Sequence, residues 1–328
     1  MNDLETTVTG KKDIKRGFAK FFFSQAMLIV LIVLFVAMSL SSDIFLSVNN
    51  IYNLFRQVAI LGVMACGMTV VVIGKGIDLS AAAIVGLAAV ANVMLQQYGY
   101  FTGVFVAITV GILCGLINGY FIGKVKANFI IVTLATQILF TAIGLIISEG
   151  RNLTSKSDRI FSYIGEEKIL GFPIIILFLI VTMVVTGILL QKTIAGRRLY
   201  AVGLNDNAAL VSGINVSNVI MGSYVINGFL CGIASLVLTS RIPRIRVGQT
   251  APYLFDTITI VVLGGTALTG GIGGIYKTAI GLAIFGVINN SMAILAIPFE
   301  YQQLIKGMIL ILAVLYDEYN RRKRLLYQ

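Results

Sequence analysis

The chain has 328 residues, of which 58% are apolar and 12% are charged. A soluble domain carries about 25% charged residues, so this composition excludes a water-soluble globular protein and indicates that much of the chain lies in lipid. The chain has no histidine, which removes the commonest metal ligand and the usual proton carrier at neutral pH. We therefore expect no catalytic residue, no metal site and no cofactor site in this chain.

The net charge of +11 would suit a nucleic-acid-binding protein, but the basic residues lie beside apolar segments. Residues 1–20 form a basic tail before the first apolar run, and residues 317–328 form another after the last run. Their basic residues are Lys11, Lys12, Lys15, Arg16 and Lys20 in the first tail, and Arg321, Arg322, Lys323 and Arg324 in the second. Basic residues beside membrane spans mark the cytoplasmic side. Both termini are therefore predicted to be cytoplasmic, with membrane lipid and not nucleic acid as a partner.

About ten apolar runs are long enough, or nearly long enough, to cross a bilayer as helices, which takes about twenty residues each. Residues 21–316 are therefore predicted to form a single all-α polytopic membrane domain. The runs are residues 21–41, 58–74, 81–96, 100–122, 129–148, 172–190, 219–240, 253–265, 276–296 and 301–316. The run at 253–265 is short, which favours a half-helix or a tilted helix.

This topology assigns each connection to one side of the membrane. Residues 193–218 form a long internal connection, and residues 149–168 form an external connection of mixed charge. Arg241, Arg244 and Arg246 fall on the external side, against the usual bias of basic residues toward the cytoplasm. An external basic cluster of this kind suggests that these arginines bind a negatively charged partner.

The chain also contains a possible internal repeat. Residues 71–74 read Val-Val-Ile-Gly at the end of the second run, and residues 261–264 read Val-Val-Leu-Gly at the end of the eighth. A short break follows each copy. Gly-interrupted segments at matching positions of two halves point to a transport site. Runs two to five are therefore expected as a possible repeat of runs seven to ten, with the motif itself shared by runs two and eight.

The internal connection 193–218 contains a short predicted helix. Asn205 can cap its N-terminus, Asp206 is favourable in its first turn, and Gly213 can end it in the left-handed conformation. Ala208 and Ala209 give this helix a small-residue face, which suits insertion into a groove on a partner. An ordinary amphipathic loop helix is the alternative interpretation.

Six polar residues in or beside the apolar runs are candidates for lining a transport pathway: Asp78, Ser80, Asn118, Asp256, Asn289 and Asn290. The two carboxylates and the serine follow or begin predicted helices, so they could line the pathway or simply cap a helix. The three asparagines lie on apolar helices, where an amide meets a polar solute or hydrogen-bonds to another helix.

Several motifs, in matching order and spacing over nearly the whole chain, resemble the permease subunits of ribose/galactose/arabinose-type ABC importers. They are Gly-Ile-Asp-Leu-Ser at 76–80, Gly203-x-Asn205-x-x-Ala208-Ala209-x-x-Ser212-Gly213-Ile214, Val-Val-Leu-Gly-Gly-Thr-x-Leu-x-Gly-Gly at 261–271, Gly-Val-Ile-Asn-Asn at 286–290 and Tyr-Gln-Gln at 301–303. This family is the binding-protein-dependent transport system inner membrane family. The chain departs from the family pattern at two places. It has Ala-Ala-Ala at 81–83, and it lacks the Glu that the family usually carries in the segment 253–256. These departures leave the identity of the sugar open.

The resemblance implies a ten-helix permease domain in the bacterial inner membrane that translocates a monosaccharide. Its implied partners are a second permease copy or homologue, two ABC ATPase subunits that bind ATP and magnesium, and an extracytoplasmic sugar-binding protein. The 193–218 connection would then be the coupling loop, and the residues implied to couple to the ATPase are Gly203, Asn205, Ala208, Ala209, Ser212, Gly213 and Ile214. Arg241, Arg244 and Arg246 would dock the binding protein, or contact phospholipid headgroups.

A secondary, ion-coupled transporter of a small polar solute is the alternative function. Ion coupling usually needs ionisable side chains deep in the membrane. The closest candidates in this sequence are Asp78, Asp256, Lys277 and Lys306, and the other charges fall at predicted helix ends or in connections. The sequence therefore favours the ATP-driven importer.

Overall fold

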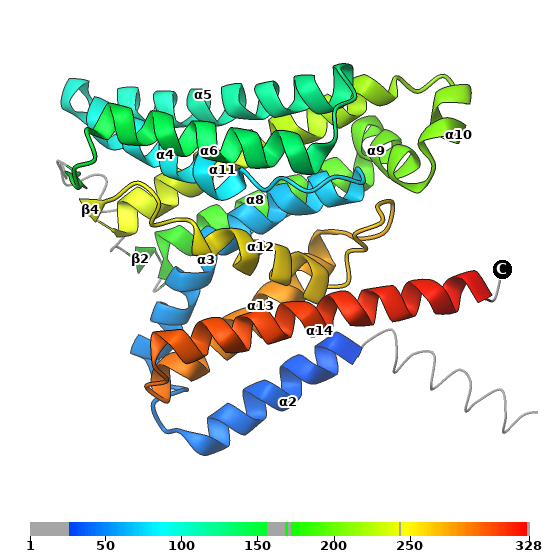
Figure 1. Ribbon diagram of the computed structural model, residues 1–328. Helices are drawn as coiled ribbons and strands as arrows, with labels where there is room; N and C mark the ends of the chain where they lie inside the picture. Colours follow the sequence, from blue (N-terminus) through cyan, green and yellow to red (C-terminus); the bar gives the residue numbers. More distant parts are fainter. Residues whose placement is uncertain (1–25, 156–167, 170–171, 243, 327–328) are drawn as a thin grey trace, which may run out of the picture.

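The computed structural model describes residues 26–155, 168–169, 172–242 and 244–326, and this part of the chain is helical apart from two short strand pairs. Within it, eight helices are long and apolar enough to cross a membrane, and two shorter apolar helices, Met27–Ser41 and Pro252–Leu263, bring the set to the predicted ten. The prediction of an all-α polytopic membrane protein is confirmed (Figure 1).

The helices before the external connection are α2 (Ala26–Ser41), α3 (Val48–Ile73), α4 (Ala81–Leu95), η1 (Gln96–Tyr98), α5 (Tyr100–Gly119), the π-helix η2 (Tyr120–Lys124) and α6 (Phe129–Ser148). Those after it are α8 (Ile174–Lys192), α9 (Ile194–Leu204), α10 (Asp206–Val211), α11 (Val216–Arg241), α12 (Pro252–Leu263), α13 (Ile275–Ile294) and α14 (Phe299–Leu326). The strands are β1 (Leu153–Thr154), β2 (Lys168–Ile169), β3 (Phe172–Pro173) and β4 (Arg244–Ile245). β1 pairs with β4 and β2 with β3, both antiparallel.

Helix α3 is the centre of the bundle. Its residues from Val58 to Ile73 are all buried, and α8, α11, α12 and α13 pack against it. A helix that is apolar on every side belongs in the interior of a bundle. The helix begins at Val48, ten residues before the predicted start at residue 58, because Ser47 accepts a hydrogen bond from the backbone N–H of Asn50 and caps a polar first section.

Helices α5 and α11 touch along their backbones. Glycines recur at every fourth position on the contact side of α5 and η2: Gly111, Gly115, Gly119 and Gly123. A Cβ atom at Gly111 would overlap the carbonyl oxygen of Gly228 on α11, and a Cβ at Gly228 would overlap that of Gly111. Small residues at this spacing let membrane helices approach closely, where van der Waals packing holds them together.

Helices α4 and α12 begin inside the bundle. After α3, residues 74–80 turn back in a non-helical segment before α4 starts (Figure 1). Thr250, on the outer connection before α12, donates its hydroxyl to the carbonyl oxygen of Ala82 in the first turn of α4, at 2.7 Å. Helix α12 has 12 residues, about 18 Å, well short of the roughly 30 Å hydrocarbon layer. The expectation of a short helix at this run is confirmed.

The two copies of the repeated motif end their helices in the same way. In the first copy the N–H of Lys75 bonds to the carbonyl of Val72, and that of Gly76 to Val71. In the second copy Gly265 bonds to Val262 and Thr266 to Val261 in the matching pattern. Lys75 and Gly265 both have positive φ angles, 70° and 88°. The local repeat therefore extends to the backbone, while a repeat of the complete halves stays a prediction.

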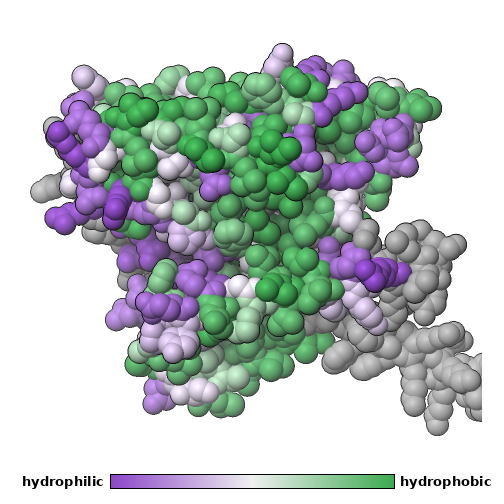
Figure 2. All heavy atoms as spheres, viewed as in Figure 1, coloured by the Kyte–Doolittle hydropathy of each residue, from purple (hydrophilic) through white to green (hydrophobic). Residues whose placement is uncertain are grey.

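The surface of the bundle agrees with a lipid environment. Figure 2 shows apolar residues over much of the visible face, with polar residues gathered mainly toward the two ends of the helices. Helix α14 lies on the outside and continues to Leu326, so most of the predicted C-terminal tail 317–328 extends this helix. The N-terminal tail 1–20 lies outside the described residues.

Candidate transport and coupling sites

The internal connection 193–218 folds into two helices, α9 and α10, at the inner end of the bundle (Figure 1). Helix α10 has the predicted caps. Asn205 Oδ1 accepts from the N–H of Ala208 at 3.0 Å, and Gly213 has a φ of 80° as the helix ends. Helix α9 was not predicted, because its two glycines and two arginines resemble a polar loop. Thr193 caps it by accepting from the N–H of Gly196 at 3.1 Å.

The two alanines of α10 differ in burial. Ala209 is buried against the rest of the chain, and Ala208 is exposed together with Ser212 and Gly213. Large apolar side chains stand out beside them, with Leu204 65%, Leu210 61% and Val211 89% exposed. An apolar group on a small protruding helix is typical of a protein–protein contact. These three residues, which we call the apolar knob, were not singled out in the sequence.

The start of this knob is fixed to the core through Gly203. A Cβ atom at Gly203 would overlap the carbonyl oxygen of Ile73, the last residue of α3, and would crowd the backbone of Gly271. Gly271 in turn donates its N–H to that same carbonyl of Ile73 at 2.9 Å. Gly203 therefore packs inside the chain, where α9 meets the ends of both repeated motifs, while Ile214 is half-buried after α10.

Side chains of α9 and α10 make two further contacts with the core. The hydroxyl of Tyr200 donates to the carbonyl oxygen of Gly273 at 3.0 Å, and the ammonium of Lys75 lies 3.6 Å from the carboxylate of Asp206. Both Lys75 and Asp206 are about half exposed, so this ion pair contributes little stability. The backbone contact at Gly203 is the stronger constraint on the position of α9.

Three of the predicted pathway residues form one buried cluster. Asp78 Oδ1 accepts from the N–H and the hydroxyl of Ser80, at 2.9 and 2.6 Å, and Asn118 donates to the Ser80 hydroxyl at 2.7 Å. Asn227 of α11, which was not predicted, donates to Asp78 Oδ2 at 2.8 Å. All four residues are 0% exposed. Ser80 is the N-cap residue of α4, but its side chain makes no capping hydrogen bond to the helix. The cluster holds the non-helical segment 76–80 to α5 and α11.

The other three predicted pathway residues do not join this cluster. Asn290 exchanges two hydrogen bonds with Asn50 of α3, at 2.9 and 2.8 Å, so its amide bonds between helices. Asn289 is 9% exposed. Asp256 in the second turn of α12 forms an ion pair with Lys306 of α14 at 3.0 Å, and both side chains are largely buried. Lys306 also lies 5.3 Å from the ring centre of Phe285.

Replacing Lys306 by methionine is expected to destabilise the folded protein, because it leaves the Asp256 carboxylate buried without its partner. Breaking a buried pair in this way costs about 3–5 kcal/mol, whereas replacing both partners by apolar residues is often neutral. The double variant Asp256→Leu/Lys306→Met should therefore be more stable than the single variant. Thermal unfolding of the two purified variants in one detergent measures the difference. Equal midpoints would show that the pair is not coupled.

The three external arginines lie on the outer side and are exposed. Arg244 belongs to β4, which pairs with β1 of the external connection 149–168. Arg241 ends α11 and donates to the carbonyl oxygen of Arg56 at 3.4 Å, and Arg246 donates its N–H to Gln249 Oε1 at 3.1 Å. The strand pairing gives Arg244 a defined position on the outer surface.

The comparisons with known proteins agree with this architecture. Residues 50–314 match the model of the family described as "Branched-chain amino acid transport system / permease component". A ribose import permease protein of Haemophilus influenzae is 35% identical over 93% of this chain and 96% of its own, and one of Bacillus subtilis is 38% identical over 88% and 90%. An L-arabinose ABC transporter permease protein of Azospirillum brasilense is 35% identical over 90% and 87%. No solved structure matches the chain.

The family match covers more than half of the chain, and the relatives align with it from end to end. The resemblance noted in the sequence is thereby confirmed. The chain therefore belongs to the family of transport-system permease components.

Proposed function

We propose that this permease translocates a monosaccharide, with the pentoses ribose and arabinose as the first candidates, after an extracytoplasmic binding protein has delivered it. The observation that carries the proposal is the end-to-end similarity to ribose and arabinose permeases from three bacteria. As a permease component, the chain is the non-catalytic, membrane-spanning subunit of an ABC transporter in the bacterial inner membrane, and ATP binds to a partner ATPase.

The coupling role is proposed for α10 together with the apolar knob. An exposed group formed by Leu204, Leu210 and Val211 at the inner end of the bundle suits a groove on an ATPase subunit. The exposed members of the predicted coupling set, Asn205, Ala208, Ser212 and Gly213, surround it. In this proposal Gly203 and Ala209, which are buried, hold the helix in place and do not touch the ATPase.

The remaining partners are proposed in the arrangement that the resemblance implies: two permease copies, or this chain and a homologue, on two ATPase subunits. The sugar would pass between the two permeases. Arg241, Arg244 and Arg246 are proposed to meet carboxylates of the binding protein, since they are exposed on the outer side and opposite charges steer association. Headgroups of the outer leaflet are the alternative contact for these arginines.

Reconstitution tests the function directly. The permease is placed in proteoliposomes with its ATPase, the binding protein is added outside, and accumulation of labelled ribose, arabinose and galactose is measured. The expected result is accumulation of one of these sugars that requires both ATP inside and the binding protein outside. Accumulation driven by an ion gradient without the ATPase would refute the proposal and favour a secondary transporter.

Val211→Arg is expected to abolish ATP-dependent uptake while the subunit stays folded, because the side chain is 89% exposed and the change disturbs only a partner. Losing a central apolar side chain from a desolvated interface costs about 2 kcal/mol of binding free energy. This lowers the affinity for the ATPase more than tenfold. Uptake and co-purification with the ATPase measure the effect. Val125→Arg, at an exposed cytoplasmic valine after η2, is the matched control, and equal losses in both variants would contradict the prediction.

A further inference from the structure

A groove lies between α8 and α13 at the inner end of the bundle, outside the sites described above. Both helices pack against α3. They come together near Gly62, where a Cβ atom would meet the side chains of Leu179 and Leu282. Further inward they leave a cavity of about 340 Å³, within the roughly 300–1,000 Å³ range of small-molecule sites.

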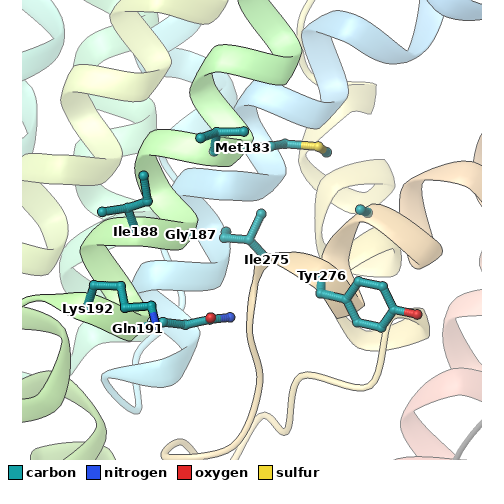
Figure 3. Close-up of a pocket in the computed structure, with 9 residues that line it drawn as sticks. Met183, Gly187, Ile188, Gln191, Lys192, Ile275 and Tyr276 are labelled. Carbon is teal, nitrogen blue, oxygen red and sulfur yellow. The ribbon is translucent and has the colours of Figure 1, made fainter.

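The lining of this groove is apolar along most of its length and polar at its inner end. Its apolar part consists of Met183, Val184, Gly187, Ile188, Ile275 and Ala279. Gln191 and Lys192 close it on the α8 side, and Tyr276 lines it from α13 with its hydroxyl pointing away from them (Figure 3). Val184 and Ile188 are both 53% exposed and Tyr276 63%, so the groove opens on the outside of the described bundle.

The inner end of the groove is basic. Arg197 donates to the carbonyl oxygen of Lys192 at 3.4 Å, which places its guanidinium beside the last residue of α8. Lys277 follows Tyr276 directly but does not line the groove, and its ammonium donates to the carbonyl oxygen of Gly265 at 3.5 Å. None of the nine lining residues is acidic. The topology puts this end at the cytoplasmic surface, where anionic lipids attract basic side chains and each Lys or Arg contributes about 1 kcal/mol.

We propose that this groove binds an anionic phospholipid of the cytoplasmic leaflet. One acyl chain lies along Met183, Gly187 and Ala279, where the absence of a side chain at Gly187 leaves room. A Cβ there would have only the Cβ of Ile275 within 4 Å, at 3.9 Å. The phosphate lies at the basic end, with Lys192 as its principal cation and the Gln191 amide as a hydrogen-bond donor.

The experiment uses the fact that the chain contains no tryptophan, so one introduced tryptophan is a unique probe. The full chain carrying Val184→Trp is reconstituted in vesicles that contain either brominated phosphatidylglycerol or brominated phosphatidylethanolamine at the same mole fraction. Bromine quenches only a tryptophan that it contacts. Val185→Trp is the matched control, since Val185 is equally exposed on α8 at the same depth but does not line the groove.

The expected result is stronger quenching by phosphatidylglycerol than by phosphatidylethanolamine at Val184→Trp, and equal quenching by the two lipids at Val185→Trp. Lys192→Gln should lower the preference for phosphatidylglycerol about five-fold, the effect of about 1 kcal/mol. Lys126→Gln, at another exposed lysine of the inner side, should not change it. Gly187→Leu, which fills the groove, should remove the preference for phosphatidylglycerol.

Two results would overturn the proposal. Equal quenching of Val184→Trp by the two lipids would show that the groove contacts bulk lipid without selecting anionic headgroups. Little quenching by either lipid would show that protein covers the groove, such as a second copy of this chain.

Discussion

Gly228→Ala is expected to separate α5 from α11 and to destabilise the bundle strongly. The new Cβ would overlap the carbonyl oxygen of Gly111 and would lie only 2.9 Å from the Cα of Gly115. Neither backbone can move without disturbing the other glycine contacts along the stripe. Overpacking of this kind costs about 1–3 kcal/mol, occasionally more, a large part of a total stability of about 5–15 kcal/mol.

The same helix supplies the control. Gly222 also lies on α11, but a Cβ atom there would have nothing within 4 Å. Gly222→Ala therefore adds no clash and gains up to about 1 kcal/mol of helix propensity. Thermal unfolding of the two variants in detergent should show a lower midpoint for Gly228→Ala and an unchanged or higher midpoint for Gly222→Ala. Equal shifts would mean that the close contact of α5 with α11 does not stabilise the fold.

Asp78→Ala is expected to be the most damaging change in the polar cluster. It removes the acceptor of Asn227 and of both donors of Ser80. Each buried donor left without an acceptor costs about 1–3 kcal/mol, so the variant should lose roughly 3 kcal/mol or more. Since segment 76–80 then loses its hydrogen bond from Asn227 of α11, uptake should fall together with stability.

Two further variants test this explanation of the Asp78 effect. Asn227→Leu removes one donor and leaves Asp78 with its bonds to Ser80, so it should cost less than Asp78→Ala. Asp43→Ala, at an exposed carboxylate on the outer side, should have no effect. The three unfolding midpoints, measured in the same detergent, check the order. If Asp78→Ala unfolded at the same temperature as Asp43→Ala, the cluster would not stabilise the segment.

The sequence predicts those features of this fold that depend on local patterns. Runs of apolar residues locate the ten membrane helices because each run must satisfy its own backbone in lipid. The ends of α10 were predicted from Asn205 and Gly213, since capping needs only neighbours three or four residues away. The short α12 follows from the length of its run.

Other features were not predicted because they depend on contacts between residues far apart in the sequence. Asp78 and its donor Asn227 are 149 residues apart, and nothing in the sequence couples them. Helix α9 was missed because its glycines lower helix propensity, whereas Gly203 is needed there for a backbone contact. The glycine stripe of α5 was visible as a spacing of four, and this signal for close helix packing could have placed α5 against another helix.

The junction at Gly203 has a mechanical consequence. Long side chains at this point could change rotamer and absorb a small displacement. Here, however, the backbone of Gly203 packs directly against the backbones of Ile73 and Gly271. Gly203 can therefore hardly move relative to Ile73 and Gly271. A displacement of α10 would therefore be transmitted to α3, at the centre of the bundle, and to the turn between α12 and α13. Both repeated motifs would then move together.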